Sequence, residues 1–160
     1  LLDMHLQETR MHRWSFNLKT GETREEDLDD EVTEFPMVNG RYKGRPYRYS
    51  YNAYMVPGFW HLDGLKKYDL KTGATQSWRA PKGCYVSEAP FAPRLNAKDE
   101  DDGYVVTYMV DSINRKAECA VFDAKDITRG PVCRIILPGY IPLGAHAYWM
   151  PMADGKRNAA

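Results

Sequence analysis

The sequence predicts an all-β chain that forms about three blades of a larger β-propeller. Short runs rich in Tyr, Val, Ile, Phe and Trp recur between clusters of Gly, Pro, Asn and Asp, and few segments have apolar residues at the spacing of an amphipathic helix. A strand-rich pattern returns roughly every 53 residues, a period that fits a large four-stranded propeller blade. Because a propeller needs about four to eight blades to close, we expect the 160 residues to be the C-terminal part of a longer protein.

Seven strands are predicted from these runs, in chain order. Each is rich in β-branched or aromatic residues and is bounded by turn formers. The predicted strands are residues 11–18, 45–54, 64–70, 76–79, 103–111, 118–123 and 132–137. The predicted turns are residues 19–22, 71–74 and 96–102.

A Leu-Lys-Thr-Gly turn is the clearest part of the repeat. It stands at residues 18–21 and again 52 residues later at 70–73, and a degraded third copy has Asp123 54 residues after Asp69. The repeats are therefore expected at roughly 11–63, 64–117 and 118–150 of one partial domain, with residues 151–160 as a polar tail.

Charge and composition exclude several classes of protein. The 22 Lys and Arg residues balance 22 Asp and Glu residues, which argues against a strongly basic nucleic-acid binder and for a soluble globular chain. No apolar run reaches the roughly 18 residues of a membrane span. Cys84, Cys119 and Cys133 lack Cys-x-x-Cys spacing and fit a reducing compartment, so we expect a cytoplasmic protein.

Three polar residues fall at comparable offsets after the repeated turns: Glu34, Glu88 and His146. Equivalent positions of propeller blades converge on one axis, so two carboxylates and one imidazole are expected near each other. Such a set suits a metal centre in which one ring nitrogen of His binds the metal and a carboxylate accepts from the other. The spacing alone also fits ordinary structural residues.

An ordered succession of motifs runs from about Trp14 to Trp149. The motifs are Glu-Phe-Pro at 34–36, Gly-Arg-Pro-Tyr-Arg-Tyr at 44–49, Lys-Tyr-Asp-Leu at 67–70, Ser-Glu-Ala-Pro-Phe at 87–91, Glu-Asp-Asp-Gly-Tyr-Val at 100–105 and Gly-Ala-His-Ala-Tyr-Trp at 144–149. This succession resembles the C-terminal portion of the carotenoid cleavage oxygenases, and it is more specific than any single motif.

The resemblance implies a seven-bladed propeller that holds a non-haem Fe(II) on its axis with four His, three of them oriented by Glu. By this resemblance His146 is the last iron ligand and Glu88 orients it. Glu34 is then the carboxylate paired with the third ligand, and the other three ligands have no counterpart in this sequence. No side chain is assigned a catalytic role of its own.

The implied activity is oxidative cleavage of a C=C bond of a carotenoid, apocarotenoid or stilbene-type substrate by O2, giving two carbonyl products. We expect the 160-residue chain alone to be inactive and to need the remaining N-terminal blades. Two alternatives stay open, namely a non-oxidative isomerase that uses the same site and a metal-free propeller that binds proteins. Nucleic acid is not an expected partner, and peripheral membrane contact by the full-length protein stays open.

The remaining histidines and several aromatic residues have less specific interpretations. The histidines expected to be on the surface or packed, rather than ligands, are His5, His12 and His61. Aromatic residues that could line an apolar tunnel, but for which core packing is favoured, are Phe35, Phe59, Trp60 and Tyr148.

Overall fold

The computed structural model describes residues 3, 5–142, 144 and 146–150, and the tail expected at 151–160 lies outside them. The strands are β1 (His12–Phe16), β2 (Thr23–Asp27), β3 (Thr33–Met37), β4 (Tyr49–Met55), β5 (Leu62–Asp69), β6 (Thr75–Arg79), β7 (Cys84–Val86), β8 (Phe91–Pro93), β9 (Gly103–Asp111), β10 (Lys116–Asp123) and β11 (Pro131–Ile136). Two 3-10 helices, η1 (Gly40–Tyr42) and η2 (Ile127–Arg129), are the helical elements of this described part, so the expected all-β class is confirmed. None of the described helices is long and apolar enough to cross a membrane.

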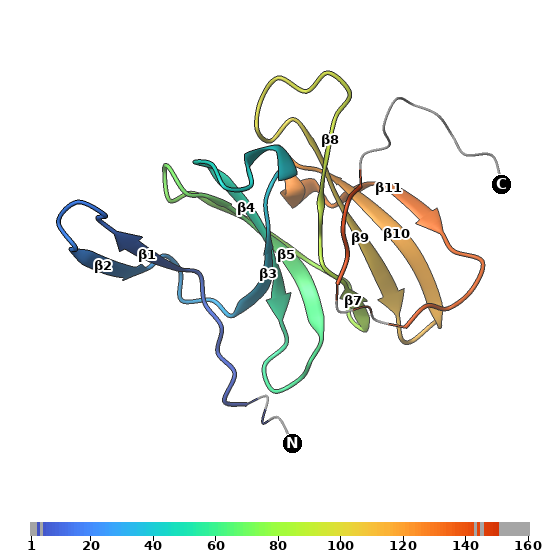
Figure 1. The fold of residues 1–160 in the computed structure, drawn as a ribbon. Coiled ribbons are helices and arrows are strands. Elements are labelled where there is room, and N and C mark those ends of the chain that lie inside the picture. The colour runs from blue at the N-terminus through green and yellow to red at the C-terminus, as the bar shows by residue number, and fades with distance from the viewer. Residues whose placement is uncertain (1–2, 4, 143, 145, 151–160) are drawn as a thin grey trace.

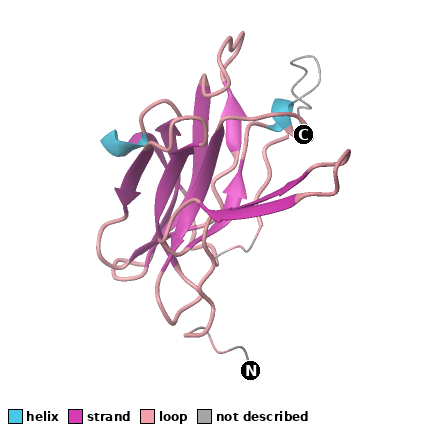
Figure 2. Cartoon of the chain, turned by 90° about the vertical axis from the view of Figure 1, so that its left-hand side faces the viewer, coloured by secondary structure: helices cyan, strands magenta, loops and turns pink. Residues whose placement is uncertain are grey.

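The strands form two antiparallel meanders and a separate hairpin (Figure 1). The first meander is β3-β4-β5-β6 and the second is β8-β9-β10-β11, while the short β7 pairs with both β5 and β9 and joins them into one nine-stranded sheet. The β1-β2 hairpin pairs with neither meander and projects from the rest of the chain, as the turned view of Figure 2 also shows. Consecutive four-stranded meanders are the building unit of a propeller.

All seven predicted strands are present, within a few residues of their expected ends. Four strands were missed: β2, β3, β7 and β8. β2 reads Thr-Arg-Glu-Glu-Asp and is mostly exposed, β3 contains Pro36, and β7 and β8 have three residues each. Charge, an internal proline and short length each hide the alternation from which strands are recognised.

The predicted turns after β1 and β5, and the turn after β10, share one geometry. Asn17, Asp69 and Asp123 each accept a hydrogen bond, at 3.0, 3.1 and 2.9 Å, from the backbone N–H two residues further on. Gly21 and Gly73 close the first two turns with φ of 77° and 76°, a conformation that glycine adopts without strain. The division of the chain into three repeats at 11–63, 64–117 and 118–150 stays a prediction.

The core lies between the two meanders. The Tyr51 hydroxyl donates to the carbonyl of Ala124 at 3.1 Å, and its ring stacks on Phe91 with centroids 5.7 Å apart. Trp78 of β6 meets the fully buried Phe122 of β10 edge-on, at 4.7 Å between centroids. Because these contacts join residues of different meanders, apolar burial holds one meander against the other.

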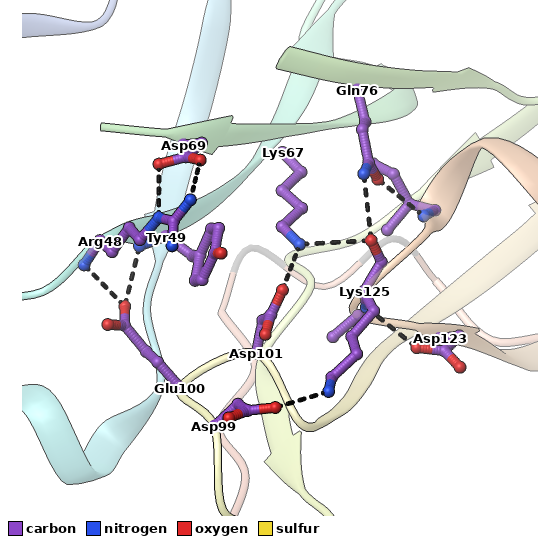
Figure 3. Close-up of polar contacts among 12 residues, drawn as sticks. Arg48, Tyr49, Lys67, Asp69, Gln76, Asp99, Glu100, Asp101, Asp123 and Lys125 are labelled. Atoms are coloured by element: carbon purple, nitrogen blue, oxygen red, sulfur yellow. Dashed lines mark hydrogen bonds and ion pairs between the residues drawn. The ribbon is translucent and has the colours of Figure 1, made fainter. Parts of the chain in front are cut away.

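A polar network ties the β8–β9 loop to the first meander (Figure 3). Glu100 Oε1 accepts the backbone N–H groups of Arg48 and Tyr49, both at 2.8 Å. Lys67 Nζ, on a side chain only 5% exposed, bonds Asp101 at 2.8 Å and lies 4.3 Å from the centroid of the Tyr49 ring. The buried charge is thus paired and hydrogen-bonded, as burial requires.

Candidate metal centre

Glu88 and His146 form the central pair of the site. Glu88 is buried, at 4% exposed, in the segment between β7 and β8. Its Oε1 lies 2.9 Å from His146 Nδ1, and its Oε2 accepts the backbone N–H of Ala147. An ionised carboxylate only accepts hydrogen bonds, so this contact makes Nδ1 the protonated nitrogen of the ring. The lone pair of Nε2 is then available to bind a metal ion.

Hydrogen bonds made by the neighbouring residue, Ser87, hold Glu88 in place. The backbone N–H of Ser87 donates to the Tyr108 carbonyl at 2.9 Å, and the Tyr108 N–H returns a bond to Ser87 Oγ at 3.2 Å. Thr107 Oγ1 also donates to the Ser87 carbonyl at 3.1 Å. Ser87 and Thr107 are buried. These bonds fasten the segment to β9, so the carboxylate of Glu88 is presented from a rigid support.

His146 lies on the chain segment that follows β11, and its side chain is 81% exposed. It borders a cavity of about 530 Å³ whose lining includes Ser87, Tyr108, Val110 and Leu137. The ring is therefore held by Glu88 on one nitrogen, and most of its surface is exposed in this part of the protein.

Glu34 lies in β3, half-buried, opposite Ala53 of β4. A buried salt bridge anchors the loop before this strand, because Lys66 Nζ contacts Asp29 and also lies 3.1 Å from Glu31 Oε2. No hydrogen bond or ion pair connects Glu34 with a histidine among the residues that the structure describes. The structure thus joins Glu88 and His146 by a hydrogen bond, whereas Glu34 makes no such bond to a described histidine.

The other three histidines lie elsewhere. His12 Nδ1 lies 2.7 Å from Asp27 Oδ1 within the β1-β2 hairpin. The ring of His61 packs 4.7 Å from that of Tyr85, and His5 is exposed near the N-terminus. Within the described ranges, no three His, Cys, Asp or Glu side chains come together as a metal site. The residues present fit one imidazole ligand and its orienting carboxylate.

Three of the four aromatic residues lie outside the core that this part of the chain forms. Phe59, Trp60 and Tyr148 are 59%, 50% and 72% exposed. Phe35 does pack against the core, and its ring also lies 5.7 Å from that of His146. This contact with the site was missed. The signal for it was Pro36 in the middle of a strand, which indicates a bulge.

Comparison with known proteins defines the class of the chain. The family model of the retinal pigment epithelial membrane protein matches residues 3–151, so the chain belongs to this family. The carotenoid 9,10(9',10')-cleavage dioxygenase of Crocus sativus is 32% identical over 154 residues, which cover 88% of this chain and 28% of that protein.

Two solved structures agree with this membership. Lignostilbene dioxygenase of Pseudomonas brassicacearum has 29% identity and a TM-score of 0.81, and the match covers 89% of this chain and 32% of that one. Cobalt-substituted apocarotenoid oxygenase of Synechocystis has 25% identity and a TM-score of 0.86, over 95% and 32% of the two chains. This chain thus spans about a third of its relatives and forms part of a seven-bladed β-propeller.

Proposed function

We propose that the protein to which this chain belongs is a non-haem Fe(II)-dependent dioxygenase. Its substrate is a carotenoid, an apocarotenoid or a stilbene-type compound, and its products are two carbonyl compounds formed by cleavage of one C=C bond with O2. The observation that carries the proposal is the hydrogen bond from His146 to the buried carboxylate of Glu88. The names of the relatives, which are carotenoid, apocarotenoid and lignostilbene oxygenases, support the reaction type.

The proposed roles follow from which nitrogen of the His146 imidazole carries the proton. Glu88 accepts a hydrogen bond from the Nδ1–H of His146, and this tautomer of the imidazole offers its Nε2 lone pair to iron. Glu34 is proposed to orient a second iron-binding histidine supplied from outside this sequence. A ferrous ion bound there supplies the O2 binding and the redox chemistry that side chains lack.

The surroundings of His146 support an apolar substrate. A second cavity, of about 270 Å³, lies beside the same segment and is lined by Met37, Phe91, Tyr148 and Trp149 together with the polar Asn39 and Lys43. Together with the cavity that His146 itself borders, it provides largely apolar walls beside this segment. Apolar walls of this kind bind a hydrocarbon chain and exclude water from it.

Metal analysis of the full-length protein tests the proposal. After anaerobic reconstitution with ferrous ion we expect about one iron per chain, and His146→Ala should lose it while the matched change His61→Ala retains it. Incubation with stilbene-type and polyene substrates under ¹⁸O2 should place label in both carbonyl products.

Three other outcomes each overturn part of the proposal. Iron without O2 consumption would favour the isomerase, and a folded protein without iron would favour the metal-free binding platform. Cleavage by the isolated 160-residue chain would refute the prediction that it is inactive alone.

Cytoplasmic location stays a prediction from the three cysteines, all of which have free thiols.

A further inference from the structure

Phe35 occupies an unusual backbone position in β3. The register passes from Glu34 opposite Ala53 to Met37 opposite Tyr51, so two residues of β3 face a single residue of β4. Phe35 is one of these two, and its φ is +54°. Positive φ is uncommon for a bulky residue and typically marks strain at a functional position. A β-bulge also re-aims the side chain that it contains.

The bulge places the Phe35 ring between two other rings. Its centroid lies 5.9 Å from that of Trp60, in the loop between β4 and β5, and 5.7 Å from that of His146. The interplanar angles are 90° and 85°, which is the edge-to-face arrangement that aromatic pairs prefer. Phe35 thus carries a contact from the first meander to the segment that follows the second.

One hydrogen bond does not by itself determine the orientation of an imidazole. The bond from His146 Nδ1 to Glu88 fixes one ring atom, but the ring can still turn about the line of that bond. A perpendicular aromatic ring restricts this turning. Within the described residues, the ring of His146 has two directional contacts, the hydrogen bond to Glu88 and the edge-to-face contact with Phe35.

We propose that Phe35 is a positioning residue for His146. Its ring, held in place by the bulge of β3 and by Trp60, sets the plane of the imidazole and hence the direction of the Nε2 lone pair. The consequence for a metal rests on the proposed function, whereas the orientation of the ring does not.

Two measurements on the full-length protein test separately the orientation of the His146 ring and its consequence for metal binding. The first is NMR of the metal-free protein labelled at histidine ¹³Cε1, with the His146 signal assigned by its loss in His146→Ala. Phe35→Leu should move this signal, because the ring current of the aromatic neighbour is lost. Phe35→Tyr should leave it near the wild-type position, and Phe59→Leu is the matched control because Phe59 contacts His61 instead.

The second measurement is the affinity for Co²⁺, read from its visible absorbance. Phe35→Leu should weaken binding about two- to tenfold, in line with the usual strength of an aromatic pair. Phe59→Leu should leave the affinity unchanged.

An unmoved His146 signal in folded Phe35→Leu protein would overturn the proposal, as would equal effects of Phe35→Leu and Phe59→Leu. If Phe35→Leu does not fold, Trp60→Leu replaces it, because the loss of the half-exposed Trp60 frees the Phe35 ring and should move the same signal in the same direction. If the wild-type protein binds no metal, the proposed function fails and the NMR result alone decides the role of Phe35.

Discussion

The carboxylate of Glu88 bonds His146 Nδ1 at 2.9 Å with one oxygen and the backbone N–H of Ala147 with the other. One buried side chain therefore orients both the imidazole and the backbone that carries it. A carboxylate that accepts hydrogen bonds on both oxygens has little freedom to turn. The structure that holds Glu88 therefore also determines the position of the histidine.

Removal of the Glu88 carboxylate is expected to weaken metal binding. Glu88→Ala in the full-length protein should lower the affinity for iron about 10- to 100-fold, because the imidazole loses both its orientation and its hydrogen-bond acceptor. Equilibrium dialysis with metal analysis measures this. Glu118→Ala is the control, since Glu118 pairs with Arg134 of β11 and not with a histidine. Equal affinities of Glu88→Ala and wild type would contradict the role of Glu88.

The support of Glu88 is expected to contribute to stability. Thr107→Val keeps the shape of a buried side chain but removes the hydroxyl that bonds Ser87, so the free energy of unfolding should fall by about 1–3 kcal/mol. Urea denaturation of the full-length protein measures the change. Thr75→Val, at an exposed position of β6, should stay within about 0.5 kcal/mol of wild type. Similar losses for both variants would show that the bonds of Ser87 are not the cause.

The core contact of Tyr51 yields a third prediction. Tyr51→Phe removes the hydroxyl that donates to the Ala124 carbonyl and leaves this buried oxygen without its partner. The expected cost is about 1–3 kcal/mol of unfolding free energy. Tyr140→Phe, at a residue 55% exposed, is the control and should change stability little. A neutral Tyr51→Phe would mean that water or another donor replaces the hydroxyl.

Acid stability is expected to depend on Asp69. The Arg48 guanidinium bonds both carboxylate oxygens of Asp69, at 2.8 and 2.6 Å, and holds the pKa of this carboxyl well below its usual range. A carboxyl with a lowered pKa in the folded state adds stability above its unfolded pKa of about 3.9, and this stability is lost as the pH falls toward the folded value.

Asp69→Asn removes the part of the pH dependence of stability that comes from this carboxyl. The variant's loss of stability relative to wild type should be largest at neutral pH and should shrink below about pH 4, as measured by urea midpoints from neutral pH to pH 2. Asp30→Asn is the control, because Asp30 is exposed. A difference between Asp69→Asn and wild type that stays constant from neutral pH to pH 2 would exclude the carboxylate charge as its source.

Strands that were predictable from sequence share a physical property. β9 alternates buried and partly exposed residues over most of its length and was predicted with its observed ends, 103–111. β3, which carries Glu34, was missed because Pro36 and the bulge at Phe35 interrupt its pattern. The candidate site therefore combines a regular strand, β9, which supports the segment of Glu88, with an irregular one, β3, where the chain departs from regular structure to place the Phe35 side chain.

The sequence by itself determined the all-β class, the shared turns and the residues Glu34, Glu88 and His146 as candidates, because local propensity and motif order are readable along a chain. Only the tertiary structure decided which of them meet. Glu88 and His146 are 58 residues apart and come together because the segment after β11 returns to the β7–β8 segment. The approach of Phe35 to His146 likewise depends on packing between strands, which no local pattern encodes.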